Sequence, residues 1–233
     1  MIEISPKLEA RITKLVANRQ KLSIKSSKIN AEFERYLLSI VKAILQKHSK
    51  NQFTDMLYTI TKELAINASK ANQKRIFFED HGLNISNPED YTKGIVLFKN
   101  EFSDSMAEEY GRKCQKRGIY VQVNFFFQAP GMYVEVINNT PVIKEEEVRL
   151  REKMKKAMEY NDIAEFYMDN MDNTEGAGLG IALTMILMKN ESIDPNLFRI
   201  ITKPQETVAR IELPFTEEYE SIRSKEQNPA NST

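Results

Sequence analysis

The hydrophobic positions in the first third of the chain follow a helical spacing. Ser5 and Pro6 are typical of a helix start, and the pattern then predicts a helix that runs to about Leu22. A second helix is predicted around residues 33–45 and a third over residues 53–71, because their apolar residues recur at three- and four-residue intervals. These apolar faces must be buried, either within one chain or in a dimeric helical bundle.

The pattern then changes between strand and helix. The run KRIFFE at 74–79 is rich in β-branched and aromatic residues and predicts a strand. Residues 80–117 return to helix, with Asn87 as an N-cap before a proline. Two alternating runs joined by Ala-Pro-Gly predict an antiparallel hairpin. The strands expected after this point are 118–128, 130–138, 198–203 and 207–215.

This order of elements predicts an α+β fold, a two-layer sandwich of a mixed, mostly antiparallel sheet with helices on one face, preceded by an N-terminal helical segment. A P-loop is excluded because no G-x-x-x-x-G-K-[ST] motif occurs, and a Rossmann fold because the glycine cluster follows a charged loop. The expected domain organisation is an N-terminal segment at 1–50, a main domain at 51–215 with a helical insertion at 80–117, a charged segment at 144–175, and a disordered polar tail at 216–233.

The charge balance limits the classes of partner. Lys plus Arg and Asp plus Glu both number 33, so no overall field draws the protein to nucleic acid or to an acidic membrane. The single cysteine, Cys114, excludes an intrachain disulfide and a cysteine-based zinc site. No signal-like or membrane-spanning apolar run occurs in the sequence, so the expected compartment is the cytoplasm, with no membrane and no nucleic acid as partner.

A glycine-rich stretch is the first candidate for chemistry. In DNTEGAGLGIAL, Gly176, Gly178 and Gly180 directly precede an apolar helix. The unpaired N–H groups and the positive dipole end of such a helix favour an anion such as phosphate. A glycine triplet before a helix is also found in ordinary loops, so this stretch needs support from elsewhere.

A second candidate lies on the third helix. The stretch KELAINASKAN places Glu63, Asn67 and Lys70 on one flank of the apolar stripe. An amide oxygen is a hard ligand suited to magnesium, and a carboxylate can orient or deprotonate a nucleophile. The alternative is that these three are ordinary surface residues.

Together these motifs resemble a known family. ELAINASKA, then VEVINNTPVI, GAGLGIAL and TVARIELPF follow the order found in the ATP-binding domain of histidine kinases, type II topoisomerases, MutL proteins and certain heat-shock chaperones, the GHKL or Bergerat-fold family. The resemblance covers residues 53–215. It implies an α/β sandwich that binds ATP and magnesium between its helices and a lid, which would be residues 144–175.

The resemblance implies a role for each matched residue. Asn67 matches the magnesium-binding asparagine, and Glu63 the general base of the hydrolysing and serine-phosphorylating members. Lys70 falls where a basic residue often meets phosphate, and Thr207 matches a threonine that helps to hold adenine. The residues that match the phosphate-binding glycine box are Gly176, Gly178, Leu179 and Gly180. In the lid, Arg151 could reach phosphates when the lid is closed, although a solvated lid surface is the safer interpretation.

One departure concerns adenine recognition. The family has an Asp-x-Gly-x-Gly pattern where this chain has Asn138, Asn139, Thr140, Pro141 and Val142. The amide oxygen of Asn138 can still accept a hydrogen bond from adenine, but its N–H₂ group needs partners of its own. Thr140 and Val142 add bulk where glycine would stand.

The function classes that remain are therefore three. Neither His48 nor His81 has the context of a phosphoaccepting histidine, so an autokinase is not favoured; His48 instead fits a helix end, where partial positive charge is favourable. The first hypothesis is an ATPase or serine-type protein kinase with Glu63 as base. The second is a non-catalytic nucleotide sensor or scaffold, and the third a degenerate fold that binds only protein. The expected partners are ATP, magnesium, a protein, and a second copy through the N-terminal helices.

Overall fold

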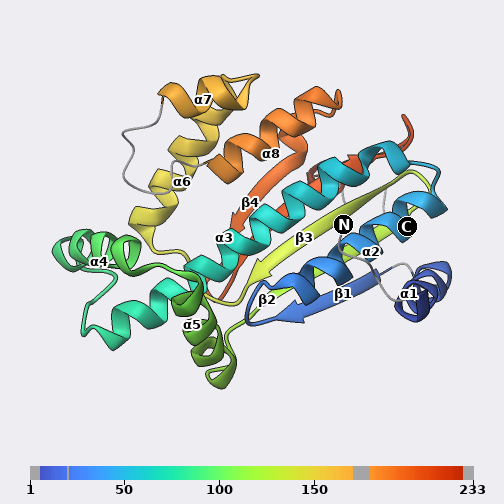
Figure 1. Ribbon diagram of the computed structural model, residues 1–233. Coiled ribbons are helices and arrows are strands. Elements are labelled where there is room, and N and C mark those ends of the chain that lie inside the picture. Colours follow the sequence, from blue (N-terminus) through green and yellow to red (C-terminus); the bar gives the residue numbers. More distant parts are fainter. Residues whose placement is uncertain (1–5, 20, 170–178, 228–233) are drawn as a thin grey trace.

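A computed structural model describes residues 6–19, 21–169 and 179–227 (Figure 1). The helices are α1 (Pro6–Asn18), α2 (Ala31–Lys47), α3 (Thr54–Asp80), α4 (Pro88–Glu101), α5 (Asp104–Lys116), α6 (Lys144–Ala157), α7 (Ile163–Asp169), α8 (Leu179–Asn190) and α9 (Ile222–Gln227). The strands are β1 (Lys21–Ser26), β2 (Val121–Gln128), β3 (Gly131–Asn138), β4 (Phe198–Thr202) and β5 (Thr207–Pro214). Single 3₁₀ turns lie at Asn51–Phe53 and Pro195–Leu197.

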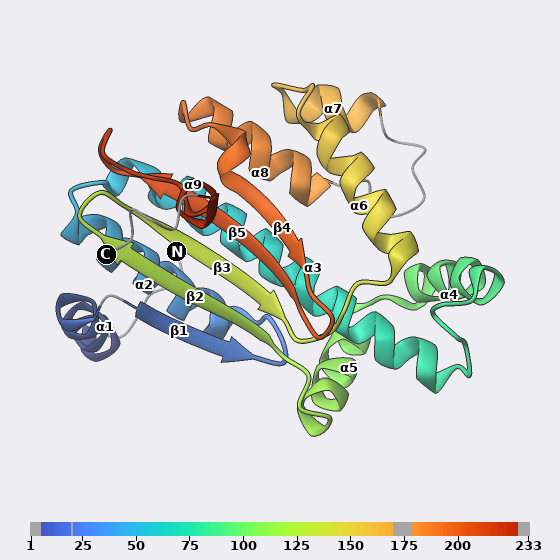
Figure 2. The same ribbon diagram turned by 180° about the vertical axis from the view of Figure 1, so that it is seen from behind.

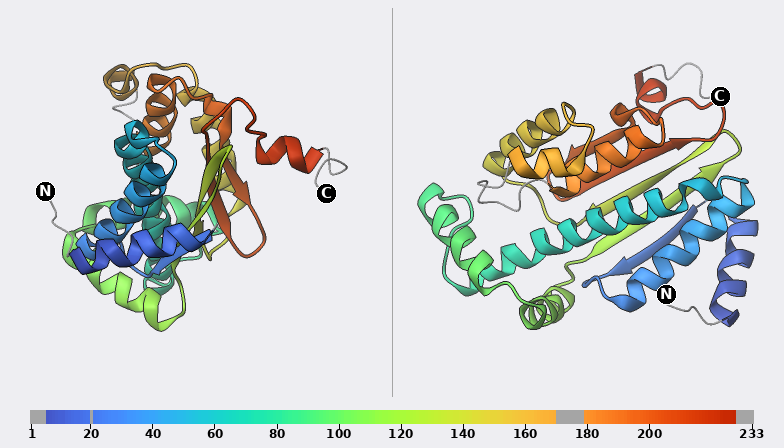
Figure 3. Two further views of the ribbon diagram at one scale, coloured as in Figure 1. Left: turned by 90° about the vertical axis from the view of Figure 1, so that its right-hand side faces the viewer. Right: turned by 45° about the horizontal axis from the view of Figure 1, so that its top comes forward.

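The fold is a two-layer α+β sandwich. The five strands have the order β1-β2-β3-β5-β4, and each neighbouring pair is antiparallel. Helices α2, α3 and α8 cover one face of the sheet, and the left panel of Figure 3 shows the two layers edge-on. The predicted fold class is confirmed.

The predicted hairpin is also confirmed, and it forms the centre of the core. Residues 121–128 and 131–138 pair in register from Val121 opposite Asn138 to Gln128 opposite Gly131. Alternate side chains point to the helices and are buried, which is the pattern that a half-covered strand requires. The buried apolar residues of the two strands are Val121, Val123, Phe125, Phe127, Met132, Val134 and Val136.

The strand predicted at 74–79 is wrong, because helix α3 continues without a break to Asp80. Ile76, Phe77 and Phe78 are fully buried in a second apolar cluster with α4 and α5. Gly94 of α4 leaves room for the Phe78 ring, since a Cβ at Gly94 would lie 2.3 Å from it. Burial of these aromatic residues on a helix outweighs their preference for strands.

The N-terminal segment 1–50 is part of the main domain. The first helix ends at Asn18 instead of Leu22, and residues 21–26 form the edge strand β1, which the sequence pattern did not predict. The apolar residues Ile12 and Val16 of α1 are buried in the same core as α2 and the sheet. Because these apolar faces pack within one chain, they no longer argue for a dimer, and the homodimer stays a prediction.

The predicted helices after residue 80 are confirmed as α4 and α5. The side chain of Asn87 caps α4 by accepting hydrogen bonds from the backbone N–H groups of Glu89 and Asp90. Gly118 follows the end of α5 with φ of +67°, a backbone conformation that favours glycine. Both ends of this insertion therefore follow from local capping rules.

The tail after residue 215 is ordered over much of its length, against our expectation of disorder at 216–233. Its helix α9 lies on the side of the sheet that carries no other helix (Figure 2) and points away from the sheet, as the left panel of Figure 3 shows. Glu212 of β5 is buried there and accepts hydrogen bonds of 2.8 Å from the Tyr219 hydroxyl and from the Ile222 N–H. The tail looks polar in sequence because its main contact is this buried carboxylate.

No helix within the described parts of the chain is long and apolar enough to cross a bilayer.

Candidate functional site

The two motifs that sequence analysis singled out meet in the structure. Asn67 lies on α3, and Gly180 lies in the first turn of α8, which packs alongside α3 (Figure 1). A Cβ atom at Gly180 would lie 2.4 Å from Nδ2 of Asn67, so only glycine allows this approach. The exposed side chain of Asn67 therefore lies against the N-terminal turn of a helix, where backbone N–H groups lack helical acceptors.

A cavity of about 310 Å³ opens beside this contact and is hereafter the base cavity. It lies between α3, α6, α8 and the ends of β3 and β5. Four of the predicted site residues line it, namely Asn67, Asn138, Gly180 and Thr207. Its other lining residues are Leu64, Ala68, Ala71, Lys74, Tyr91, Val136, Val142, Glu146, Arg149, Leu150, Lys153, Ile181, Ile200 and Ala209.

Asn138 is held in one orientation by a buried polar network. Its Nδ2 atom donates to the Thr140 carbonyl at 3.3 Å, to the Thr140 hydroxyl at 3.0 Å and to Asn72 Oδ1 at 3.5 Å. A carbonyl can only accept, so the amide nitrogen must face Thr140 and the oxygen must face the opposite way. Within the described chain no group donates to Asn138 Oδ1, which leaves this acceptor available at the cavity wall.

Asn72 and Thr140 are thus residues of the candidate site that sequence reasoning missed or misread. We expected Thr140 to add bulk to the site. Its side chain instead points into the network and donates to Asn72 Oδ1 at 2.7 Å. Asn72 is fixed in turn, since its Nδ2 atom donates to the Tyr120 carbonyl. The threonine that replaces a family glycine supplies the partner that the N–H₂ group of Asn138 needs.

Thr207 completes the polar end of the cavity. The register of β3 and β5 places it directly opposite Asn138. Its hydroxyl donates to the Thr140 carbonyl at 3.2 Å, so it belongs to the same network. Adjacent antiparallel strands explain why two residues 69 positions apart in sequence lie on one cavity wall.

Replacing Asn138 with aspartate, the residue found at this point in the family that the sequence resembles, is expected to destabilise this protein by about 2 kcal/mol at pH 7. A carboxylate oxygen would replace the donor and face the Thr140 carbonyl and Asn72 Oδ1, which are both acceptors. The loss should shrink on acidification, because a protonated carboxyl can donate again. Urea unfolding at pH 7 and pH 5 measures it.

Asn139→Asp is the matched control for this prediction. Asn139 accepts from the Tyr120 N–H at 2.7 Å and donates to Gly118 at the surface, so aspartate keeps the first bond and loses an exposed one. We expect a loss under about 1 kcal/mol for the control. Equal losses in the two variants would show that the Asn138 network is not as the structure draws it.

Helices α4 and α6 supply further residues that the sequence motifs did not indicate. Tyr91 of α4 is buried, and its ring lies 5.5 Å from Lys74 Nζ and 4.8 Å from the guanidinium of Arg149. All three side chains line the base cavity, and Lys153 joins them from α6. The insertion and the predicted lid therefore form one wall of the cavity.

An ion-pair cluster fastens the start of α6 to α3. Glu146 pairs with both Lys74 and Arg75, and its side chain is only 12% exposed. Arg75 also donates to the Pro141 carbonyl at 2.6 Å, which ties down the loop after β3. Burial alone would raise the pKa of the Glu146 carboxyl, but the two ion pairs outweigh burial and hold that pKa at about 2.

The remaining predicted residues lie in different places. Glu63 precedes Asn67 by one turn of α3, but it lines neither the base cavity nor the cavity next to it. Lys70 lines that neighbouring cavity, with its Nζ atom 5.0 Å from the Phe102 ring centre. Leu179 is the first residue of α8. Gly176 and Gly178 lie outside the described residues.

Arg151 does not face the cavity. It donates to the Ile200 carbonyl at the edge of β4 and pairs with Glu147, which in turn accepts from the Thr202 hydroxyl. Lys189 of α8 binds the end of α6 through the carbonyls of Met158 and Tyr160. The described part of the predicted lid is thus packed on α8 and on the sheet edge.

Two residues with potential reactivity have structural positions. His48 stands at the end of α2, packed against Phe127 and Phe215, and burial lowers the pKa of its imidazole, which disfavours the partial positive charge that we expected at this helix end. Burial raises the pKa of the Cys114 thiol to about 11, which leaves it protonated at neutral pH.

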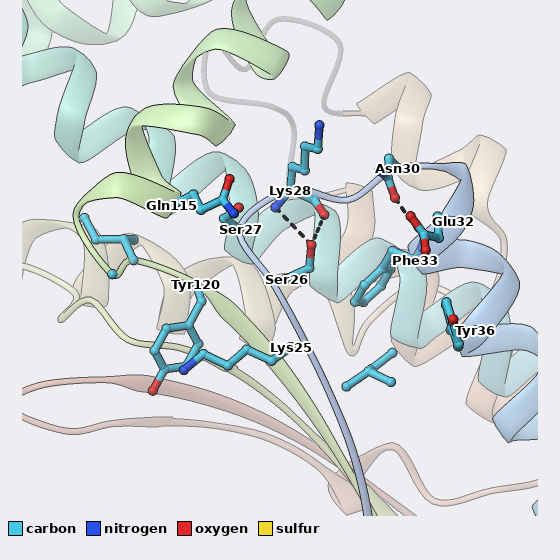
Figure 4. Close-up of a pocket in the computed structure, with 13 residues that line it drawn as sticks. Lys25, Ser26, Ser27, Lys28, Asn30, Glu32, Phe33, Tyr36, Gln115 and Tyr120 are labelled. Carbon is cyan, nitrogen blue, oxygen red and sulfur yellow. Dashed lines mark hydrogen bonds between the residues drawn. The ribbon is translucent and has the colours of Figure 1, made fainter. Parts of the chain in front are cut away.

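A separate surface hollow of about 570 Å³ lies between β1, the start of α2 and the end of α5 (Figure 4). Three of its polar side chains already have structural partners. Asn30 caps α2, Lys28 pairs with Glu108, and Lys25 lies over the Tyr120 ring. It shares no described residue with the base cavity, so we do not assign the candidate site to it.

Comparison with known proteins gives one similarity. A protein of Treponema pallidum (strain Nichols), described only as uncharacterized, is 29% identical over 215 residues, which is 92% of this chain and 42% of that protein. The chain therefore spans about two-fifths of the length of this relative. No family model and no solved structure matches the chain.

Proposed function

We propose that this protein binds ATP and magnesium in the base cavity, as a signalling protein with a GHKL-type domain. One observation carries the proposal. Asn67 and the first turn of α8 are in direct contact beside a cavity whose polar end is formed by Asn138 and Thr207. Four residues that are distant in sequence, one from each motif of the resemblance, thus line one cavity.

The polar end of the cavity suits an adenine base. The available Oδ1 acceptor of Asn138 can receive a hydrogen bond from the exocyclic amino group of adenine. Guanine presents a carbonyl oxygen at the same ring position, and two acceptors cannot pair. The rest of the lining is largely apolar, and a volume of about 310 Å³ is at the small end of the range for ligand pockets.

The other end suits phosphate and metal. The first turn of α8 offers backbone N–H groups and a positive dipole end to an anion. Asn67 offers an amide oxygen, and Mg²⁺ is usually held by one or two protein oxygens together with phosphate oxygens and water. A single asparagine at this point is therefore a sufficient protein contribution to a nucleotide-bound magnesium.

The position of Glu63 favours a second candidate, a nucleotide sensor without turnover. A general base must come within hydrogen-bond reach of its proton donor, directly or through one water. Glu63 lines neither cavity, although it stands one turn from Asn67. Phosphate release by the parent and by Glu63→Gln decides between the two: a loss of release in the variant supports an enzyme, and no release by a parent that binds ATP supports a sensor.

Calorimetric titration with ATP and MgCl₂ tests binding itself. We expect heat for ATP, none for GTP at the same concentration, and a loss of roughly tenfold or more in ATP affinity for Asn67→Ala. Asn18→Ala, an exposed asparagine of α1 away from the cavity, is the matched control. A parent that shows neither heat nor thermal stabilisation at millimolar ATP would overturn the proposal.

A further inference from the structure

A second cavity of about 410 Å³ lies directly beside the base cavity, between α3 and α4. The two cavities share Asn67, Ala71 and Lys74 of α3 and Lys153 of α6. The other lining residues of the second cavity are Lys70, Ile95, Phe98, Lys99 and Phe102. We call it the lysine cavity, because four of its nine described lining residues are lysines.

The charge of the lysine cavity is unbalanced. No acidic side chain occurs among its described lining residues. Lys74 is paired with Glu146, but Lys70 and Lys99 form no ion pair with any described carboxylate. Lys70 and Lys99 are exposed, so solvent screens the repulsion between them, but together with Lys74 and Lys153 they give the cavity a positive potential that favours an anion.

Lys99 is the lysine that α4 adds. It stands in the last turn of α4, where a cation gains up to about 1 kcal/mol from the helix dipole whether or not a ligand is present. The buried ring of Phe98 and the ring of Phe102, 5.4 Å apart, anchor this turn against α3 beside the cavity. Lys99 is thereby held at the cavity rim.

We propose that the lysine cavity receives the outer phosphates of the nucleotide whose base lies in the base cavity, beyond the phosphate that faces the first turn of α8, and that Lys99 is one of their ligands. This inference rests on the proposed function. Asn67, the residue to which we assign magnesium, lines both cavities, so a ligand that extends from Asn138 past Asn67 would have the lysines next along its path. The insertion at 80–117 thus supplies charge to the nucleotide site.

The experiment compares three probes at fixed ionic strength: adenosine, ATP with MgCl₂, and inorganic tripolyphosphate. Lys99→Gln is expected to weaken ATP and tripolyphosphate binding by about tenfold and to leave adenosine binding unchanged. Lys93→Gln is the matched control, since Lys93 is an exposed lysine of the same helix that lines neither cavity. Urea unfolding verifies that both variants remain folded.

The probes separate the two proposals. If tripolyphosphate binds in a manner that depends on Lys99 while adenosine and ATP show no base-dependent binding, the anion site stands and the adenine site falls. If ATP and adenosine bind but Lys99→Gln changes neither ATP nor tripolyphosphate affinity, the lysine cavity is not the phosphate site. An equal loss in Lys93→Gln would reduce the effect to general surface charge and overturn the assignment of Lys99.

Discussion

Glu146→Ala is expected to lower the free energy of unfolding by about 3–5 kcal/mol at pH 7. The substitution leaves Lys74 and Arg75 next to each other, with side chains that are 16% and 12% exposed, and removes the carboxylate that both contact. Loss of one member of a largely buried ion pair is costly because the remaining charges stay desolvated without compensation. Urea unfolding of parent and variant measures the difference.

The ion pairs of Glu146 also make the free energy of unfolding depend on pH. Because the pKa of Glu146 is about 2 in the folded protein against an ordinary value of 4.5, the ionised carboxylate stabilises the fold above pH 4.5. At 1.36 kcal/mol per pH unit this difference corresponds to roughly 3 kcal/mol, in line with the loss expected for the alanine variant. As the pH falls toward 2 the contribution disappears, and more than half of it should be gone at about pH 3.

Glu145→Ala is the control for the Glu146 prediction. Glu145 occupies the same first turn of α6 and shares its favourable position near the helix N-terminus, but it is exposed. We expect a loss below about 1 kcal/mol for Glu145→Ala. Two results would contradict the role of the ion-pair cluster in fastening α6. One is a loss in the free energy of unfolding for Glu146→Ala that is no larger than the loss for Glu145→Ala. The other is a difference between these two losses that is the same at pH 7 and pH 3.

The parts of the fold that could be predicted are those that local rules decide. The β2–β3 hairpin consists of two largely alternating runs on either side of a turn signal, and the start of α4 shows an asparagine cap followed by proline. In both cases the local sequence contains all the groups that fix the structure. The local sequence of the C-terminal half of α3 does not determine its structure in this way. Phe77 and Phe78 favour a strand locally and become helical only through packing on α4 and α5.

The candidate site divides in the same way. Asn67 and Gly180 could be named because glycine and asparagine motifs reflect backbone and metal chemistry that depend on residue type. The partners Asn72, Arg149 and Lys153 could not, because their roles depend on which helices lie side by side. The partners of the Asn138 N–H₂ group could not be identified from the sequence for the same reason, since they are residues whose positions only the fold determines.

Gly180→Ala is expected to reduce Mg–ATP affinity by roughly 100-fold while it changes stability by less than about 1 kcal/mol. The added methyl group would lie 2.4 Å from Nδ2 of Asn67, so one of the two must move. Asn67 is exposed and Nδ2 is the last atom of its side chain, so rotation of this side chain relieves the clash at little cost. The methyl group also narrows the base cavity, which Gly180 lines.

A double variant shows whether Gly180 acts through Asn67. If alanine at 180 works mainly by displacing Asn67, then Asn67→Ala combined with Gly180→Ala should bind ATP about as weakly as Gly180→Ala alone, far short of the product of the two single losses. Gly111→Ala, a buried helical glycine on α5 where an added Cβ would lie 3.0 Å from Cβ of Lys28, controls for crowding by a methyl group outside the base cavity. Independent, multiplying losses would mean that the two residues do not share one binding element, and unchanged affinity in Gly180→Ala would remove the first turn of α8 from the site.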